Sequence, residues 1–504
     1  MLPTQLSLNG VDQFKKLAYR NYPLYHWTIS HLPHASGEVG LHMAWRAFER
    51  ARRQVPAYSR FLGEQGYVEG RHGSLAEQLA SIPATDKNNY VRLFSTAERC
   101  VGGRIPAEQV IVDESSGSTG LPYNWVRSRA EVEYTRRVCS YFLRHALSGG
   151  PLFVINAFSM GAWATGITMS AALEQNGIVK STGPDVEKIL HTLRFFGPHY
   201  QYLITGYPPF LKHLLDYADA QGFDWTGYRL VAMVGGEGMS ECLRAYLLGR
   251  FDKVLSGYGA SDLEIGVAAE SDLSIGIRRL MEQRDDVRHA LLGDEQRAPM
   301  LFQYNPLDHY IETNADSELI VTINRPLLSP RIRYNIKDEG GIISFEKMNS
   351  QLRSVGVEMQ TLLPKGATRP HLPFVYVFGR RDSTLSYMGA NIYPEDVEAG
   401  LLSDHDVASR LGAFCMELEE DSNTGEVHPC IHVEVTGGLP SDELAQALQQ
   451  LVRNKLYELS ADFRQAMRED HSAGELRIEL HIAGQGPFAE MSQRIKRRYI
   501  IQRP

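Results

Sequence analysis

A run of small and hydroxylated residues at 115–120, SSGSTG, offers the clearest chemistry in the sequence. Glycines let consecutive backbone N–H groups converge on an anion, and hydroxyls add donors, so the run suits a polyphosphate. The lysine that a P-loop requires after its last glycine is absent, because Leu121 and Pro122 follow Gly120. Taken alone, the run is equally compatible with phosphate binding and with a flexible surface loop.

The elements around this run alternate regularly. Apolar runs at 151–155, 200–205, 228–234 and 253–255 end close to glycines, and helical stretches at 186–197, 209–221 and 239–250 separate them. This order predicts an α/β fold with mostly parallel strands. Ligands of such sheets bind beyond the carboxyl ends of the strands, where the glycines fall.

The pattern changes after residue 300. Runs at 319–323, 341–345 and 374–378 are typical of antiparallel or barrel strands, which predicts a small barrel-like subdomain. Further on, a strand at 429–435, a long helix near 441–468 and a strand at 475–482 predict a small α+β unit. We therefore expect an N-terminal domain over 1–380 and a C-terminal domain over 381–504. A helix is also expected over 41–66.

Composition narrows the classes of partner. The chain has 504 residues, 43% of them hydrophobic, and a net charge of −8, which argues against nucleic acid or a membrane as a partner. Five cysteines without a CxxC pair indicate reduced thiols in a cytoplasmic protein. We expect no signal peptide and no membrane span.

The run at 115–122 resembles the phosphate loop of adenylate-forming enzymes, the superfamily of acyl-CoA synthetases, luciferases and nonribosomal adenylation domains. Other segments resemble that superfamily's later motifs in the same order: 235–237 (GGE), 257–262 (GYGASD), 332–338 (IRYNIKD), 379–382 (GRRD) and 388–398 (MGANIYPEDVE). Upstream, 55–58 (VPAY) and 82–87 (IPATDK) resemble the phenylacetate–CoA ligase branch. The ordered matches extend from residue 50 to about 400.

This resemblance implies that the protein activates a carboxylic acid with ATP as an acyl-adenylate and releases pyrophosphate. The residues implied to bind ATP or AMP are Ser115, Ser116, Gly117, Ser118, Thr119, Gly120, Gly235, Gly236, Glu237, Tyr258, Gly259, Ser261, Asp338 and Arg380. Asp262 stands where the family has a magnesium-binding glutamate, which makes it a metal ligand and a catalytic residue, and Glu264 is the alternative carboxylate. Lys496 matches the catalytic lysine near the C-terminus, although Ile495 replaces the usual glycine before it. Asp382 is the expected hinge of a mobile C-terminal domain.

The acid and the acceptor are less specified. Phe158, Trp163 and Tyr207 could line a pocket for an aryl or arylacetic acid, or could be ordinary core aromatics. Gly389 and Ala390 lie where the pantetheine of CoA would pass. CoA is the favoured acceptor, with a carrier protein or an amine as alternatives, and a homodimer is considered.

Two features leave other interpretations open. The segment 265–315 is an Arg/Asp-rich insertion, interpreted as decoration or an interface. The departures at Leu121, Asp262 and Ile495 also fit a catalytically silent scaffold that binds a nucleotide.

Overall fold

The computed structural model describes residues 5–31, 33–70, 73–115, 123–147, 151–161, 164–236, 238–239, 241–293, 295, 299–364, 370–380, 385–392, 394–401, 403–404, 407, 410–420, 427–435, 439–470, 475–489 and 500–501.

Eleven strands of the described chain form one large sheet in the order β10-β11-β12-β13-β9-β8-β7-β6-β5-β3-β4. The bounds of these strands are β3 Leu152–Asn156, β4 Ile178–Ser181, β5 Gln201–Gly206, β6 Arg229–Gly235, β7 Lys253–Tyr258, β8 Ala268–Ala269, β9 Met300–Gln303, β10 His309–Thr313, β11 Glu318–Ile323, β12 Tyr334–Ile343 and β13 Phe374–Arg380. Strands β4, β3, β5, β6 and β7 pair in parallel, and every other pairing in this sheet is antiparallel.

The predicted α/β class is confirmed, with two differences. The sheet is mixed rather than mostly parallel, because the strands after residue 300 continue it in antiparallel pairs. For the same reason no barrel closes among the described strands: β9 pairs with β13 and, through Ala269, with β8, which joins it to the parallel half. The run predicted at 341–345 is the end of β12, and helix α13 begins at Phe345.

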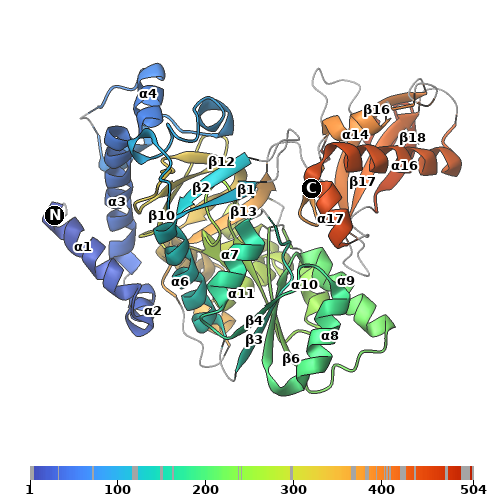
Figure 1. Cartoon of the computed structure of the whole chain (residues 1–504), viewed down its shortest axis with the longest axis horizontal. Helices are drawn as coiled ribbons and strands as arrows, with labels where there is room; N and C mark the ends of the chain where they lie inside the picture. The colour runs from blue at the N-terminus through green and yellow to red at the C-terminus, as the bar shows by residue number, and fades with distance from the viewer. Residues whose placement is uncertain are drawn as a thin grey trace.

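Helices cover both faces of the parallel half (Figure 1). Alternate residues of a strand face opposite sides, so the β3 run divides between two cores. Phe153 and Ile155 belong to the core cluster that also contains residues of helices α8 (Val186–Phe196), α9 (Pro208–Ala220) and α10 (Glu241–Leu247). Val154 packs with helices α6 (Arg129–Ala146) and α7 (Ala164–Leu173). Burial on both faces explains why these strands are continuous apolar runs.

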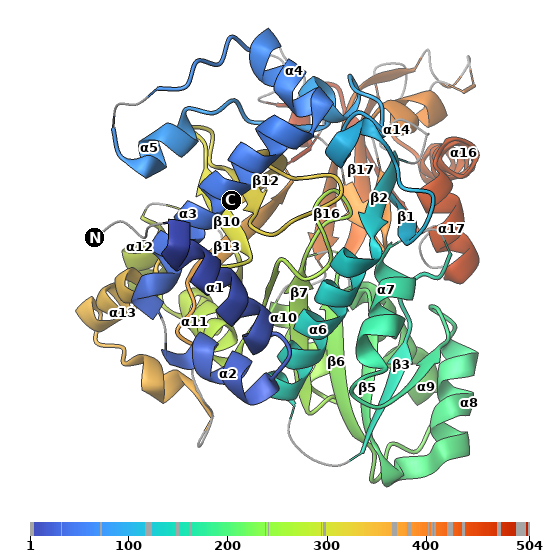
Figure 2. The same cartoon turned by 60° about the vertical axis from the view of Figure 1, so that its left-hand side comes forward.

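Other helices extend the molecule on the side of the antiparallel strands. The N-terminal helices are α1 Gln5–Ala18, α2 Tyr22–His31, α3 Pro33–Gln54, α4 Pro56–Glu64 and α5 Leu75–Ala80 (Figure 2). The helix expected over 41–66 is two helices, because α4 starts afresh with Pro56 at its first position. In the predicted insertion, α11 (Asp272–Gln283) and α12 (Asp285–Leu292) pack with α13 (Phe345–Ser354) in one apolar cluster.

The C-terminal part has its own sheet in the order β16-β17-β18 (Figure 1). Its elements are the hairpin β14 Leu385–Tyr387 and β15 Ala390–Ile392, then α14 Pro394–Leu401, β16 Leu411–Glu420, β17 Val427–Val435, α16 Asp442–Leu459, α17 Ala461–Glu469 and β18 Arg477–Ile482. The long helix expected near 441–468 divides at Ser460, whose hydroxyl caps α17 by accepting from the N–H of Phe463. The domain boundary near residue 381 stays a prediction.

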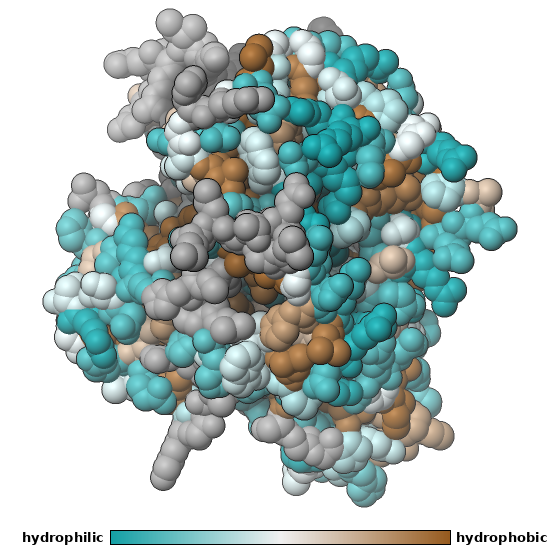
Figure 3. All heavy atoms as spheres, turned by 90° about the vertical axis from the view of Figure 1, so that its left-hand side faces the viewer, coloured by the Kyte–Doolittle hydropathy of each residue, from teal (hydrophilic) through white to brown (hydrophobic). Residues whose placement is uncertain are grey.

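Among the described helices, none combines the length and the apolar character needed to cross a membrane. On the face that carries the N-terminal helices, hydrophilic side chains surround scattered small groups of hydrophobic ones (Figure 3).

Candidate active site

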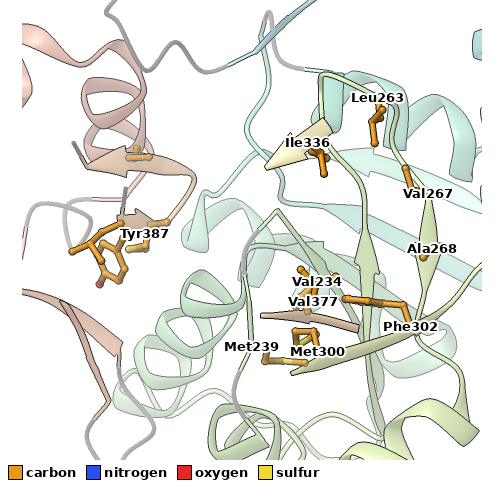
Figure 4. Packing of buried hydrophobic residues seen from close by; sticks show 14 of the residues in the cluster. Val234, Met239, Leu263, Val267, Ala268, Met300, Phe302, Ile336, Val377 and Tyr387 are labelled. Carbon is orange, nitrogen blue, oxygen red and sulfur yellow. The ribbon is translucent and has the colours of Figure 1, made fainter. Parts of the chain in front are cut away.

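A cavity of about 650 Å³ lies at the carboxyl ends of the parallel strands. Residues that follow β3, β5, β6 and β7 line it, as the strand-end rule predicts. Strands β12 and β13 and the β14–β15 hairpin complete the wall. Among its lining residues, Val234 lies near Met300 and Val377 from the antiparallel half (Figure 4). The cavity therefore forms where the two halves of the sheet meet.

Among the described residues, six of those predicted to bind the nucleotide line this cavity: Gly235, Gly236, Tyr258, Gly259, Ser261 and Asp338. The Tyr258 hydroxyl donates to Asp338 Oδ2 at 2.5 Å, and the Tyr258 ring stacks on Phe302 with centroids 5.5 Å apart. Gly236 has φ +85°, and a Cβ there would meet the Tyr207 ring at 2.8 Å, so this position requires glycine. Arg380 on β13 pairs with Asp338 on β12. Sequence motifs 80 residues apart thus meet at one wall.

The flanks of the predicted phosphate loop are anchored beside this wall. Strands β1 (Val110–Ser115) and β2 (Tyr123–Ser128) pair with Ser115 opposite Tyr123. Arg127 on β2 donates to the carbonyl oxygens of Ser261 at 2.6 Å and Leu263 at 2.7 Å. These two hydrogen bonds connect β2, at the base of the predicted loop, to the segment that carries Asp262.

Asp262 is 5% exposed and belongs to a compact polar cluster. Its Oδ1 lies 3.2 Å from Lys87 Nζ, and its Oδ2 accepts from the Tyr334 hydroxyl at 2.8 Å. Lys87 and Asp262 both line the cavity, and the Lys87 side chain is 23% exposed. An accessible cation therefore faces the predicted metal carboxylate.

Glu264, the alternative carboxylate, is part of a buried ion cluster. The Arg325 guanidinium donates to both of its carboxylate oxygens, and His309 Nε2 lies 2.5 Å from Oε1. Burial alone would raise the pKa of Glu264, but Arg325 and His309 hold it well below its usual range. Because this carboxylate is fully engaged by protein groups, the geometry favours Asp262 as the site for a cation.

Lys87 is the residue that sequence reasoning missed. It opens a short helical turn, Lys87–Val91, which Asp86 caps by accepting from the N–H groups of Asn88 and Asn89. The 82–87 segment carried a sequence signal. However, Lys87 and Asp262 are 175 positions apart, so no local pattern could predict their contact.

Apolar side chains also line the cavity, and one of them, Tyr207, lies next to Gly236. Phe158 and Tyr207, both predicted here, contact edge to face with centroids 5.4 Å apart. Met169, Met233 and Ile265 also line the cavity and pack in the same cluster. The surface they form suits an apolar acid.

The β14–β15 hairpin brings the predicted acceptor residues to the same part of the cavity. Gly389 lines the cavity with φ +82°, and a Cβ there would meet the Tyr207 ring at 2.9 Å. Ala390 follows as the first residue of β15 and is buried. Nearby, the Ser159 hydroxyl donates to Glu469 of α17. The C-terminal elements therefore contact the apolar part of the cavity.

The remaining predicted residues fall outside the described part of the chain, or have only their backbone in it. Those outside are Ser116, Gly117, Ser118, Thr119, Gly120, Trp163, Glu237, Asp382, Lys496 and the neighbouring Leu121 and Ile495; backbone alone is described for Ser115 and Arg380.

Comparisons with known proteins show which enzymes the chain is similar to. No family model matches the chain. It is 23% identical over 401 residues to a phenylacetate-coenzyme A ligase of Pseudomonas putida, covering 77% of this chain and 79% of the relative. It is 23% identical over 451 residues to a phenylacetate-coenzyme A ligase of Thermus thermophilus, covering 87% and 90%.

Solved structures give the same picture of the fold. A 2-hydroxyisobutyryl-CoA ligase in its thioesterification state, with 2-HIB-AMP and CoA, superposes with a TM-score of 0.62 at 16% identity, over 94% of this chain and 91% of that one. The same ligase in the postadenylation state with 2-HIB-AMP gives 0.53. In sequence and fold the chain is similar to enzymes of the adenylate-forming superfamily, and these similarities support the predicted class of enzyme, an ATP-dependent ligase. Within that superfamily it is similar to the phenylacetate–CoA ligases.

Proposed function

We propose that this protein activates an apolar carboxylic acid, aryl or arylacetic, as an acyl-adenylate and then transfers the acyl group to CoA. One observation carries the proposal. A single cavity combines the Tyr258–Asp338 wall, the Lys87–Asp262 pair and an apolar pocket. These are the parts needed to hold a nucleoside, a charged phosphate chain and an acid side by side.

In the first step a carboxylate oxygen attacks the α-phosphorus of ATP. The new P–O bond forms as the bond to the β-phosphate oxygen breaks, and pyrophosphate leaves with that electron pair. Catalysis of this step rests on alignment and on neutralising charge. Lys87 would supply a positive charge at the phosphates, in place of the lysine that is absent after Gly120. Lys496 stays our proposed contact to the acid carboxylate and the α-phosphate.

Asp262 would hold Mg²⁺ at the phosphates. The ion takes oxygen ligands and is often bound by one or two carboxylates together with substrate phosphates, and Asp262 offers such a carboxylate at the cavity wall. When bound, the ion neutralises phosphate charge. Lys87 would then exchange its contact with Asp262 for one with the phosphates.

The apolar pocket supports an aryl or arylacetic acid. Phe158 and Tyr207 present an edge-to-face pair, and aromatic rings favour further aromatic partners in that geometry. Trp163 remains a proposed member of this pocket.

CoA is the proposed acceptor because the hairpin with Gly389 and Ala390 lies beside the pocket. The relatives named above are CoA ligases. A rotation of the C-terminal domain about Asp382 would bring this hairpin to the cavity in one state and Lys496 in the other.

Pyrophosphate release across a panel of carboxylic acids, with ATP and Mg²⁺, tests the proposal. We expect release with aryl or arylacetic acids, and CoA should accelerate turnover and yield a thioester. Amine and carrier-protein acceptors serve as parallel arms. Absence of release with every acid would support the silent-scaffold alternative, and release that only an amine stimulates would reject CoA.

A further inference from the structure

One face of the C-terminal sheet carries a cluster of polar side chains on strands β17 and β18. Alternate residues of a strand share a face, so Cys430 and His432 of β17 project together, as do Glu479 and His481 of β18. The parallel register places His432 directly opposite Glu479. The intervening residues, such as Val433, belong to the apolar core that includes α16. Two short alternating pairs, C-x-H and E-x-H, thus meet on one surface.

Three potential ligand atoms converge there. His432 Nδ1 lies 3.0 Å from His481 Nε2 and 3.4 Å from Glu479 Oε2, and the last two atoms are 4.0 Å apart. The centre of the circle through a triangle with sides of 3.0, 3.4 and 4.0 Å lies about 2.1 Å from each corner, which equals a zinc–nitrogen or zinc–oxygen bond. The buried Cys430 Sγ is within 4.8 Å of the ligand atoms of His432 and Glu479.

A fourth side chain orients the central ring. His432 Nε2 lies 2.8 Å from Glu417 Oε1, and both residues are buried. When Nε2–H donates to that carboxylate, the lone pair of the neutral ring is at Nδ1, facing His481 and Glu479. Metal-binding histidines commonly have this arrangement, with a carboxylate on the second ring nitrogen. The same lone pair can accept a hydrogen bond from His481 Nε2–H, 3.0 Å away, or bind a cation that takes the place of that proton.

We propose that this face binds Zn²⁺, with His432 Nδ1, His481 Nε2 and Glu479 Oε2 as ligands. Imidazole ligands suit zinc, whereas magnesium prefers oxygen. The Glu479 side chain is 41% exposed and that of His481 20%, so an ion can reach the site from solvent. Zinc here would join β17 to β18, separately from the magnesium proposed at Asp262.

Metal titration of the full-length protein tests the site. After treatment with a chelator, the protein is titrated with Zn²⁺ in competition with a chromophoric indicator, and with Co²⁺ to record its visible spectrum. We expect one saturable site with tetrahedral cobalt bands and a higher melting temperature with Zn²⁺. His481→Gln should abolish this binding, and Glu417→Gln should weaken it about 10- to 100-fold. His191→Gln, on helix α8, is the matched control and should bind as the wild type does.

Two results would overturn the proposal. One is the absence of saturable Zn²⁺ binding by the folded wild-type protein, since the contact between His432 and His481 would then be a hydrogen bond alone. Another is a His481→Gln protein that binds as tightly as the control.

Discussion

Removal of the Lys87 charge is the most direct test of the candidate active site. At 3.2 Å from Asp262 Oδ1, the ammonium has a gross Coulomb attraction of about 5 kcal/mol at an effective dielectric constant of about 20. If phosphate oxygens take the place of that carboxylate, Lys87→Ala forfeits part of a similar attraction in the transition state. Loss of one such preorganised group typically costs about 3 kcal/mol, or roughly 100- to 200-fold in the adenylation rate.

The assay is pyrophosphate release with saturating acid and varied ATP, measured on Lys87→Ala, Lys87→Arg and Lys337→Ala. Lys337 is the control, because it too pairs with a carboxylate, Glu318 at 3.4 Å, but does not line the cavity. Lys87→Arg should retain more activity than Lys87→Ala, since the charge remains. A folded Lys87→Ala protein that adenylates within about threefold of the wild type would refute this role of the lysine.

Three further predictions concern other parts of the cavity. Glu264→Gln should lower the free energy of unfolding by about 3–5 kcal/mol in denaturant titrations at pH 7, because it leaves Arg325 buried without its counter-ion. Folding lowers the pKa of Glu264, so its contribution to the free energy of unfolding is fully present above its unfolded pKa, about 4.3, and is lost as the pH falls. The free energy of unfolding of Glu264→Gln should therefore decrease less steeply with falling pH than that of the wild type. Phe158→Ala should reduce kcat/KM for aryl acids at least tenfold relative to short aliphatic acids, and equal losses would reject the pocket. Gly389→Ala should slow thioester formation more than pyrophosphate release, because its Cβ would meet the Tyr207 ring.

The sequence predicts the parallel half of the fold well, for a physical reason. Strands buried on both faces must be continuous apolar runs, and their ends need small residues where ligands approach, so β5 and β6 show both features locally. The antiparallel half was interpreted as a separate barrel because pairing partners are not local properties. The pairing of β9 with β8 joins the halves through one residue pair, Ala269 with Gln303, which no local pattern reveals.

The candidate site could likewise be predicted from the sequence only in part. Motifs located Asp338, Tyr258 and Gly236 at the cavity, since each lies at a strand end or in a strand with a recognisable signature. Local motifs do not predict which distant residues form ion pairs. Asp262 and Glu264 are two positions apart, chemically alike and equally buried, and only their partners distinguish them: the Lys87 side chain is 23% exposed, whereas that of Arg325 is 8% exposed.

That distinction changes how the chain's departures from the family pattern are understood. Taken singly, a missing lysine after Gly120 and an aspartate in place of a glutamate both suggest lost activity. In three dimensions the shorter carboxylate of Asp262 already faces a lysine, Lys87, and the Tyr334 hydroxyl. A glutamate at position 262 would extend its carboxylate by one methylene into these two groups. Aspartate at 262 and lysine at 87 therefore form one unit, and a cation at the phosphates can come from a different place in the sequence.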